Sequence, residues 1–194
     1  MQKKVLRSAI VAFFAAIICA TGFFRVPVPG IQQGILIQNA MCVLTAVLLG
    51  GVAGVLPTAL FVAVGVLGLP VFAGGQGGFQ VLTHIHGGYR IGWVLAALVA
   101  GVISLRPSVA EKHVTKGMVV RLSLAVLVGL LVVYVPELLY VVAFEKASLG
   151  VGGAVRLFCA AFFAPFVLVD LLKAAVVVVL ALKIRPVVAQ YLYD

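Results

Sequence analysis

Long apolar runs separated by short polar or Gly/Pro-rich segments dominate this chain. The apolar runs cover residues 5–24, 38–53, 57–69, 89–105, 118–140 and 160–184. A helix needs about 20 apolar residues to cross the hydrocarbon core of a bilayer. The pattern predicts an all-α integral membrane protein, a single transmembrane domain over residues 1–194 with about six transmembrane helices. The run at 57–69 is short, which favours local bilayer thinning or a helix that ends against a loop folded back into the protein.

Three of the segments between or within these runs carry turn and helix-breaking signals. Residues 25–37 contain Pro and Gly, and they are predicted to form an irregular outer connection. Residues 144–156 contain three glycines and are predicted to connect the last two helices. Pro136, followed by Glu137, is predicted to kink or end the fifth helix near its outer end.

The segment 68–93 is rich in glycine but apolar at most other positions, so a solvated linker is not expected. Glycine lets the backbone lie close to a ligand or to neighbouring helices. The chain has no G-x-x-x-x-G-K-[ST] pattern that would cradle nucleotide phosphates. We therefore expect that the chain does not hydrolyse ATP itself.

The distribution of positive charge predicts the membrane topology. The chain carries 64% hydrophobic residues, only 10% charged residues and a net charge of +9. Lys and Arg gather before the first run, in the gap after residue 105 and after the last run, which places both termini in the cytoplasm. We expect a multi-pass protein of the plasma membrane, surrounded by lipid and without nucleic acid as a partner. The residues behind this assignment are Lys3, Lys4, Arg7, Arg106, Lys112, Lys116, Arg121, Lys183 and Arg185.

Asp170 and Lys173 interrupt the last apolar run, in the stretch PFVLVDLLK. An ionisable group at mid-membrane depth costs roughly 2.5–3.5 kcal/mol on insertion scales, so it is retained where it is paired or used. The i, i+3 spacing places both side chains on one face of a helix, with Asp170 in the second turn if the helix begins near Pro165. The pair either fastens this helix to the bundle or forms a polar floor for a ligand.

Small residues form a stripe on the first predicted helix. Ser8, Ala12, Ala16 and Ala20 follow one another at steps of four, which permits close approach by another helix. The stripe either packs inside the protein's own bundle or docks a second membrane protein.

His84 and His86 flank Ile85 in the glycine-rich loop. Such a pair can chelate a metal, but no third ligand is evident nearby, so hydrogen bonding within the loop is favoured. We predict no metal and no other cofactor.

The loop and the last helix together resemble the BioY family, the biotin-specific S components of energy-coupling factor (ECF) transporters. The resemblance rests on GLPVFAGGQGG at 68–78, on GGY at 87–89, on D-x-x-K in the last helix, on the small-residue stripe and on Gln38. Residues 85–89 read IHGGY where the family reads P-T-G-G-Y, and residues 36–38 read LIQ where it reads T-L-Q. The resemblance implies a six-helix protein with an outer vitamin site capped by loops. It also implies coupling to a membrane scaffold (T) component and two cytosolic ATPases, with the stripe as the contact face.

Under this resemblance, the candidate site residues match the chemistry of biotin. Asp170 can accept hydrogen bonds from the ureido N–H groups, while Lys173 can donate to the ureido carbonyl. Arg90 is the cation expected to serve the valerate carboxylate or the Asp170 network. The remaining polar and aromatic candidates are Gln38, Asn39, Phe72, Phe79, Tyr89 and Trp93.

Other function classes are weaker on this sequence. An intramembrane enzyme could use Asp170, Lys173 and the histidines, but it would need an activated nucleophile or a metal cluster that the sequence does not display. An ion-conducting or proton-relay protein would need more intramembrane charges. An S component for a different small vitamin remains an alternative, and binding of labelled biotin separates these classes.

Overall fold

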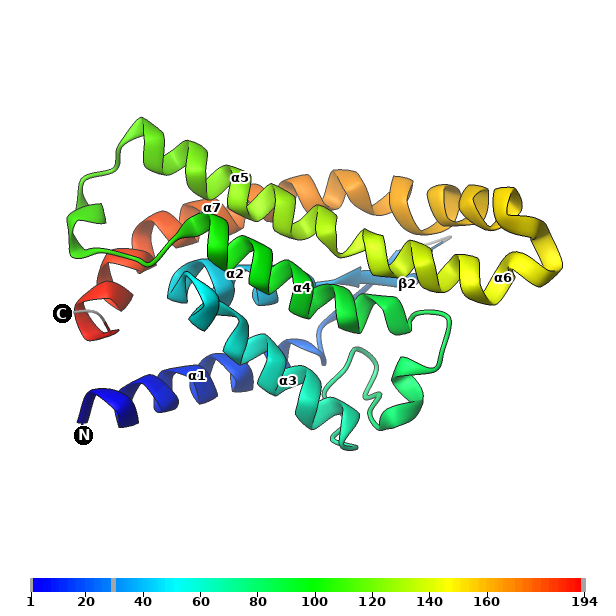
Figure 1. Ribbon diagram of the computed structural model, residues 1–194, viewed down its shortest axis with the longest axis horizontal. Helices are drawn as coiled ribbons and strands as arrows, with labels where there is room; N and C mark the ends of the chain where they lie inside the picture. The colour runs from blue at the N-terminus through cyan, green and yellow to red at the C-terminus, as the bar shows by residue number, and fades with distance from the viewer. Residues whose placement is uncertain (1, 29–30, 193–194) are drawn as a thin grey trace.

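The computed structural model describes residues 2–28 and 31–192, and over them the chain is predominantly helical (Figure 1). The α-helices are α1 (Gln2–Thr21), α2 (Gln38–Leu49), α3 (Leu56–Val66), α4 (Gly87–Ser104), α5 (Lys116–Val132), α6 (Tyr134–Leu157) and α7 (Ala164–Leu192). Short 3-10 segments are η1 (Val52–Val55), η2 (Phe79–Leu82) and η3 (Val109–Lys112), and a π-helical segment, η4 (Phe158–Phe163), precedes α7. Two strands, β1 (Arg25–Val28) and β2 (Ile31–Leu36), form an antiparallel hairpin.

The helices pack lengthwise around α4, which contacts α2, α3, α5 and α6, while α7 packs against α2 and α5. Both chain ends lie at one end of the bundle, and the hairpin of α6, η4 and early α7 extends at the other (Figure 1). Small side chains permit this close packing, because association of apolar helices depends on van der Waals contact. Buried examples are Ala46, Ala96, Ala97, Ala100, Ala125, Ala174 and Ala181.

Two helical stretches are long and apolar enough to cross a membrane: Gly87–Ser104, and Lys116–Leu192, which contains α5, α6 and α7 in succession. Shorter apolar helices occupy Val5–Thr21, Gln38–Leu49 and Val52–Val66. These lengths agree with a helical membrane protein. The count of six spans and the cytoplasmic location of the termini stay predictions.

The short third helix ends against a loop that folds back, as one of the two alternatives predicted. After α3 the chain returns so that Phe72, only 1% exposed, packs edge-on against Phe61 of α3 at a ring-centroid distance of 5.2 Å. The amide of Gly78 also donates to the carbonyl of Gly65 over 2.7 Å. The glycine-rich segment is thus packed against the bundle.

The connection over residues 25–37 is more regular than predicted, because β1 and β2 pair within it. Its β-branched residues suit strands. The register shifts between Val26 and Val28, at Pro27, whose nitrogen has no hydrogen to donate to a ladder. Pro29 and Gly30 lie outside the described residues.

The predicted connection over residues 144–156 contains a break between two helical stretches, at Gly150, although the residues on both sides of that break are helical and α6 is bounded as Tyr134–Leu157. The departure from helical geometry is at Gly150, with φ 68° and ψ 166°. Glycine adopts this positive φ without steric cost, which explains why the break falls there. The helix break expected near Pro136 is confirmed, since α5 ends at Val132 and Pro136 lies in the first turn of α6.

The last helix extends beyond the predicted limit at residue 184 and continues through Pro186 to Leu192. Arg185, expected among the charges that follow the last run, is instead 0% exposed. Burial of this guanidinium was not predictable from the chain order, because its partners come from distant segments.

Candidate functional site

Asp170 lies at the centre of a polar cluster inside the apolar bundle. Its carboxylate is 6% exposed and accepts hydrogen bonds from Lys173 Nζ at 2.9 Å and Asn39 Nδ2 at 3.2 Å, both on Oδ1. The hydroxyl of Tyr134 donates to Oδ2 over 2.6 Å. Lys173 Nζ also donates to Asn39 Oδ1 over 3.1 Å. Three helices, α2, α6 and α7, therefore meet at one carboxylate.

Local structure explains how each side chain reaches this point. The i, i+3 spacing on α7 holds Lys173 beside Asp170, and the predicted contact between them is confirmed. Asn39 lies in the first turn of α2, where its Oδ1 also accepts from the amide of Ala40 at 2.8 Å. Tyr134 is the first residue of α6, immediately after the break at Val133. The break redirects the chain where its phenol meets the carboxylate.

A narrow pocket with about 30 Å³ of free space lies beside this cluster. Small-molecule sites usually hold roughly 300–1,000 Å³, so a ligand enters only if the walls move apart. Its walls are mainly aromatic, and its polar groups are concentrated at the Asp170 end. Such a pocket suits a small, partly apolar ligand that offers N–H donors and a carbonyl acceptor at one end. The lining residues are Leu36, Asn39, Tyr89, Trp93, Val133, Tyr134, Phe166, Asp170 and Lys173.

A second, more polar pocket of about 350 Å³ adjoins the first turn of α4. Arg90 lines it and donates to the carbonyl of His86 at 2.5 Å and to Gln76 Oε1 at 2.8 Å. Its guanidinium carbon lies 5.5 Å from the ring centroid of Phe72, and its buried Nε has no hydrogen-bond partner within the described residues. Arg90 does not line the pocket beside Asp170, although the preceding residue, Tyr89, does.

Glu137 joins the loop before α4 to α6. Its side chain is 0% exposed, and it accepts from the amide of Tyr89 at 3.0 Å while its other oxygen lies 2.9 Å from His86 Nδ1. Gly88 permits this approach, since a Cβ there would lie 2.5 Å from the carbonyl oxygen of Pro136. The predicted hydrogen bonding of the loop histidines is confirmed for His86, and Glu137 positions Tyr89 at the pocket.

Some predicted site residues lie elsewhere. Gln38 is 1% exposed and donates to the carbonyls of Ile18 and Val71, which ties α2 to α1 and to the loop. Phe72 packs in the core against Phe61 and Trp93. Phe79 is 66% exposed on η2. None of these three lines the pocket beside Asp170: Gln38 faces α1 and the loop, Phe72 faces the core, and Phe79 is exposed.

Tyr134, Val133 and Phe166 line the pocket without having been predicted. They fall within apolar runs, where an aromatic or aliphatic residue is normally a core or lipid-facing residue. The sequence signal that could have identified Tyr134 is its place two residues before Pro136, at a helix break inside a run. Glu137 carried a comparable signal as a carboxylate in an apolar run.

The small-residue stripe of α1 faces outward. Ala12, Ala16 and Ala20 are exposed, whereas Ala15 and Ile18 on the opposite side are buried against the bundle. The first helix therefore contacts its own bundle mainly through another face.

Comparison with known proteins agrees with this architecture. The sequence profile of the BioY family matches residues 1–190. The chain is 31% identical to the biotin transporter BioY of Thermotoga maritima, over 95% of this chain and 96% of the relative. It is 34% identical to the biotin transporter BioY of Rhodobacter capsulatus, over 98% and 95% of the two chains.

A solved structure shares the fold along nearly the whole length. It is the S-component for biotin from an ECF-type ABC transporter, matched with a TM-score of 0.70 and 25% identity over 95% of this chain and 93% of that chain. Full-length agreement in sequence and in helix arrangement leads to one conclusion: the chain belongs to the BioY family.

Proposed function

We propose that this protein captures biotin as the substrate-binding component of an ECF-type transporter and serves its uptake across the membrane. The observation that carries the proposal is the buried Asp170 cluster at the floor of an aromatic pocket, in a chain of the BioY family. A binding function fits a site that orients a ligand through fixed hydrogen bonds and holds it between aromatic walls.

The ring end of biotin matches the floor of the pocket. Its two ureido N–H groups are donors for the carboxylate of Asp170, and its ureido carbonyl is an acceptor for Lys173 or for the amide of Asn39. Hydrogen bonds to ionised groups are about twice as strong as those between neutral groups, so the Asp170–Lys173 pair favours the ureido end of biotin. The sulfur-containing ring lies among apolar faces such as Tyr89, Trp93 and Phe166.

Equilibrium binding of labelled biotin to the purified protein in detergent tests the proposal. Saturable binding displaced by unlabelled biotin, and not by other vitamins of similar size, is the expected result. Absence of saturable binding by folded protein would overturn it, and displacement by another vitamin would assign the site to that vitamin instead.

Arg90 is assigned to the valerate tail, which extends from the first pocket toward the second. The basis is the position of Arg90 beside Tyr89 and its buried, unpartnered Nε within the described residues. Arg90→Ala should weaken binding of free biotin by about 1.5–3 kcal/mol, the usual worth of a bond to a charged group. It should weaken binding of a neutral biotin amide much less, as measured by competition against labelled biotin.

The matched control is Arg156→Ala, which removes the same charge from an exposed position on α6. It should leave both affinities unchanged. Equal losses for biotin and its amide in Arg90→Ala would mean that Arg90 serves the ring end or the loop structure.

Tyr134 is assigned to holding the Asp170 carboxylate. Tyr134→Phe keeps the aromatic wall and removes one O–H···O bond, so biotin affinity should fall by about 0.5–1.5 kcal/mol. Tyr140→Phe, farther along α6, is the control, because that ring stacks on Phe144 and does not line the pocket. Unchanged or tighter binding by Tyr134→Phe would contradict the assignment.

In this proposal the protein is a multi-pass protein of the plasma membrane with both termini in the cytoplasm. Energy comes from a membrane scaffold component with two cytosolic ATPases, because the chain has no phosphate-binding loop of its own. The outward stripe of Ala12, Ala16 and Ala20 is the proposed docking face for the scaffold component.

A further inference from the structure

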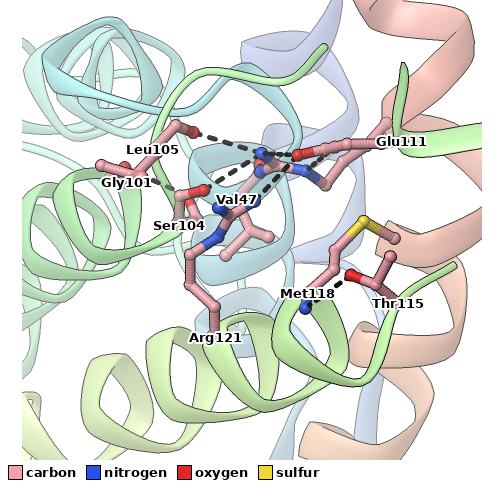
Figure 2. Close-up of polar contacts among 9 residues, drawn as sticks. Val47, Gly101, Ser104, Leu105, Glu111, Thr115, Met118 and Arg121 are labelled. Atoms are coloured by element: carbon pink, nitrogen blue, oxygen red, sulfur yellow. Dashed lines mark hydrogen bonds and ion pairs between the residues drawn. The ribbon is translucent and has the colours of Figure 1, made fainter. Parts of the chain in front are cut away.

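A buried charge cluster lies far from the candidate site, toward the end of the bundle that holds both termini. Arg185 of α7 is 0% exposed, and its Nε donates to Glu111 Oε2 at 2.8 Å while its Nη2 donates to Glu111 Oε1 at 3.2 Å. Arg121 of α5 reaches the same carboxylate from the other side, at 2.9 Å (Figure 2). Two cations and one anion leave an excess positive charge that the surroundings must offset.

Backbone carbonyls at the ends of two other helices provide that offset. Arg185 donates to the carbonyl of Val47 near the end of α2, and to those of Ser104 and Leu105 at the end of α4, the latter two at 3.1 and 3.2 Å. The last carbonyls of a helix have no partner within it and carry partial negative charge. The planar guanidinium offers five donors, so one side chain caps two helices and pairs with Glu111.

The helices joined by Arg185 also carry the candidate site. Asn39 lies at the opposite end of α2, Tyr89 and Trp93 lie near the opposite end of α4, and Asp170 and Lys173 precede Arg185 on α7. Asp170 and Arg185 are separated by about 22 Å of helix, at 1.5 Å rise per residue. Polar contacts therefore hold α2 and α7 together at both ends, while α4 joins them at the Arg185 end and is bonded to α6 through Glu137 at the other.

Between these two clusters the contacts are apolar and made largely by small side chains, such as Ala46, Ala100 and Ala181. Such contacts are non-directional, so they define the axial position of one helix against another only weakly. Hydrogen-bonded buried charges are directional and costly to break, which suits them to specify a single register.

We infer that Arg185, with Glu111, is a positioning residue for ligand binding. It holds α7 in axial register with α2 and α4, and so keeps Asp170 and Lys173 in hydrogen-bonding geometry with Asn39 at the other end. The identity of the ligand in this inference rests on the proposed function, but the register itself does not.

The test compares three variants of the full-length protein. Arg185→Met combined with Glu111→Gln removes both fully buried partners together, whereas a single change would strand the other. Arg121 then loses its contact with Glu111, but its side chain is 34% exposed to solvent. Arg185→Lys keeps the charge but loses the fork of donors. Arg121→Met is the matched control, because it removes a cation from the same cluster whose described contact is with Glu111 and not with a helix-end carbonyl.

Two quantities are measured on each folded variant. The first is the Kd for labelled biotin, and the second is the rate of amide hydrogen exchange of residues 39–45 and 168–174 without ligand. The double variant should bind biotin about tenfold more weakly, in the range of coupling between distant sites, with faster exchange in both segments. Arg185→Lys should lie between it and the wild type. Arg121→Met should stay within about twofold, as expected for a partly exposed ion pair.

A folded double variant with wild-type Kd and wild-type exchange at the site would overturn the inference, even if its melting temperature fell. Should the double variant not fold, Arg185→Lys decides, and equality with Arg121→Met in both readouts would overturn the inference. A wild-type protein that fails to bind biotin refutes the proposed function instead, while the exchange comparison still tests the register.

Discussion

Asp170→Asn is expected to weaken biotin binding by about 1.5–3 kcal/mol, the usual worth of a hydrogen bond to a charged group. The change keeps the shape of the side chain but removes the charge that Lys173, Asn39 and Tyr134 surround. It also replaces one acceptor oxygen with an NH₂ group, which repels the ureido N–H donors. Equilibrium binding of labelled biotin to the purified variant measures the effect.

Lys173→Met should cause a similar loss, and the double variant should lose less than the sum of the two. Each single change strands a buried charge, whereas the double change removes the whole pair. Glu145→Gln neutralises a carboxylate on α6 outside the pocket and serves as the control. Wild-type affinity in folded Asp170→Asn would remove this residue from the binding site.

Replacing Ala12 and Ala16 together by Trp is expected to abolish co-purification with the scaffold component. Both side chains are exposed on α1, and close contact between membrane helices requires small residues at the interface. Biotin binding by the isolated protein should survive, because the pocket is lined by other elements. Pull-down from membranes that contain the ATPase module measures co-purification with the scaffold component. A binding assay on the purified protein measures its affinity for biotin.

Leu124→Trp is the control for this experiment, since Leu124 is exposed on α5 and lies off the first helix. It should retain the partner. If the stripe instead packs within the protein's own bundle, the paired substitution should lower thermal stability and biotin affinity together. Loss of co-purification, with thermal stability and biotin affinity both retained, supports docking of the scaffold component on the stripe.

The limits of prediction from sequence follow from the range of each interaction. The Asp170–Lys173 contact was predictable because both residues lie within one turn of the same helix, where spacing alone decides the geometry. The hairpin of β1 and β2 was not predicted, nor were the helical stretches on either side of the break at Gly150, because Pro and Gly received more weight there than the residues between them.

Gln38 and Phe72 show why a motif does not by itself place a side chain in a pocket. Both belong to the segments that resemble the family, and both are almost fully buried. Gln38 instead satisfies two backbone carbonyls between α1 and the loop, and Phe72 fills the space between Phe61 and Trp93. Asn39, the neighbour of Gln38, faces the Asp170 cluster instead, since adjacent residues on a helix face different directions.

The sequence by itself determined the helical membrane class, the family and the local charge pair, because hydropathy, motif order and i, i+3 spacing are properties of the chain. Only the tertiary structure decided which groups surround that pair. Asn39 lies 131 residues from Asp170 and Tyr134 lies 36, while Arg185 meets Glu111 across 74 residues. These contacts depend on how α2, α4, α6 and α7 pack, and close packing of apolar helices is set by the shape of all their side chains together.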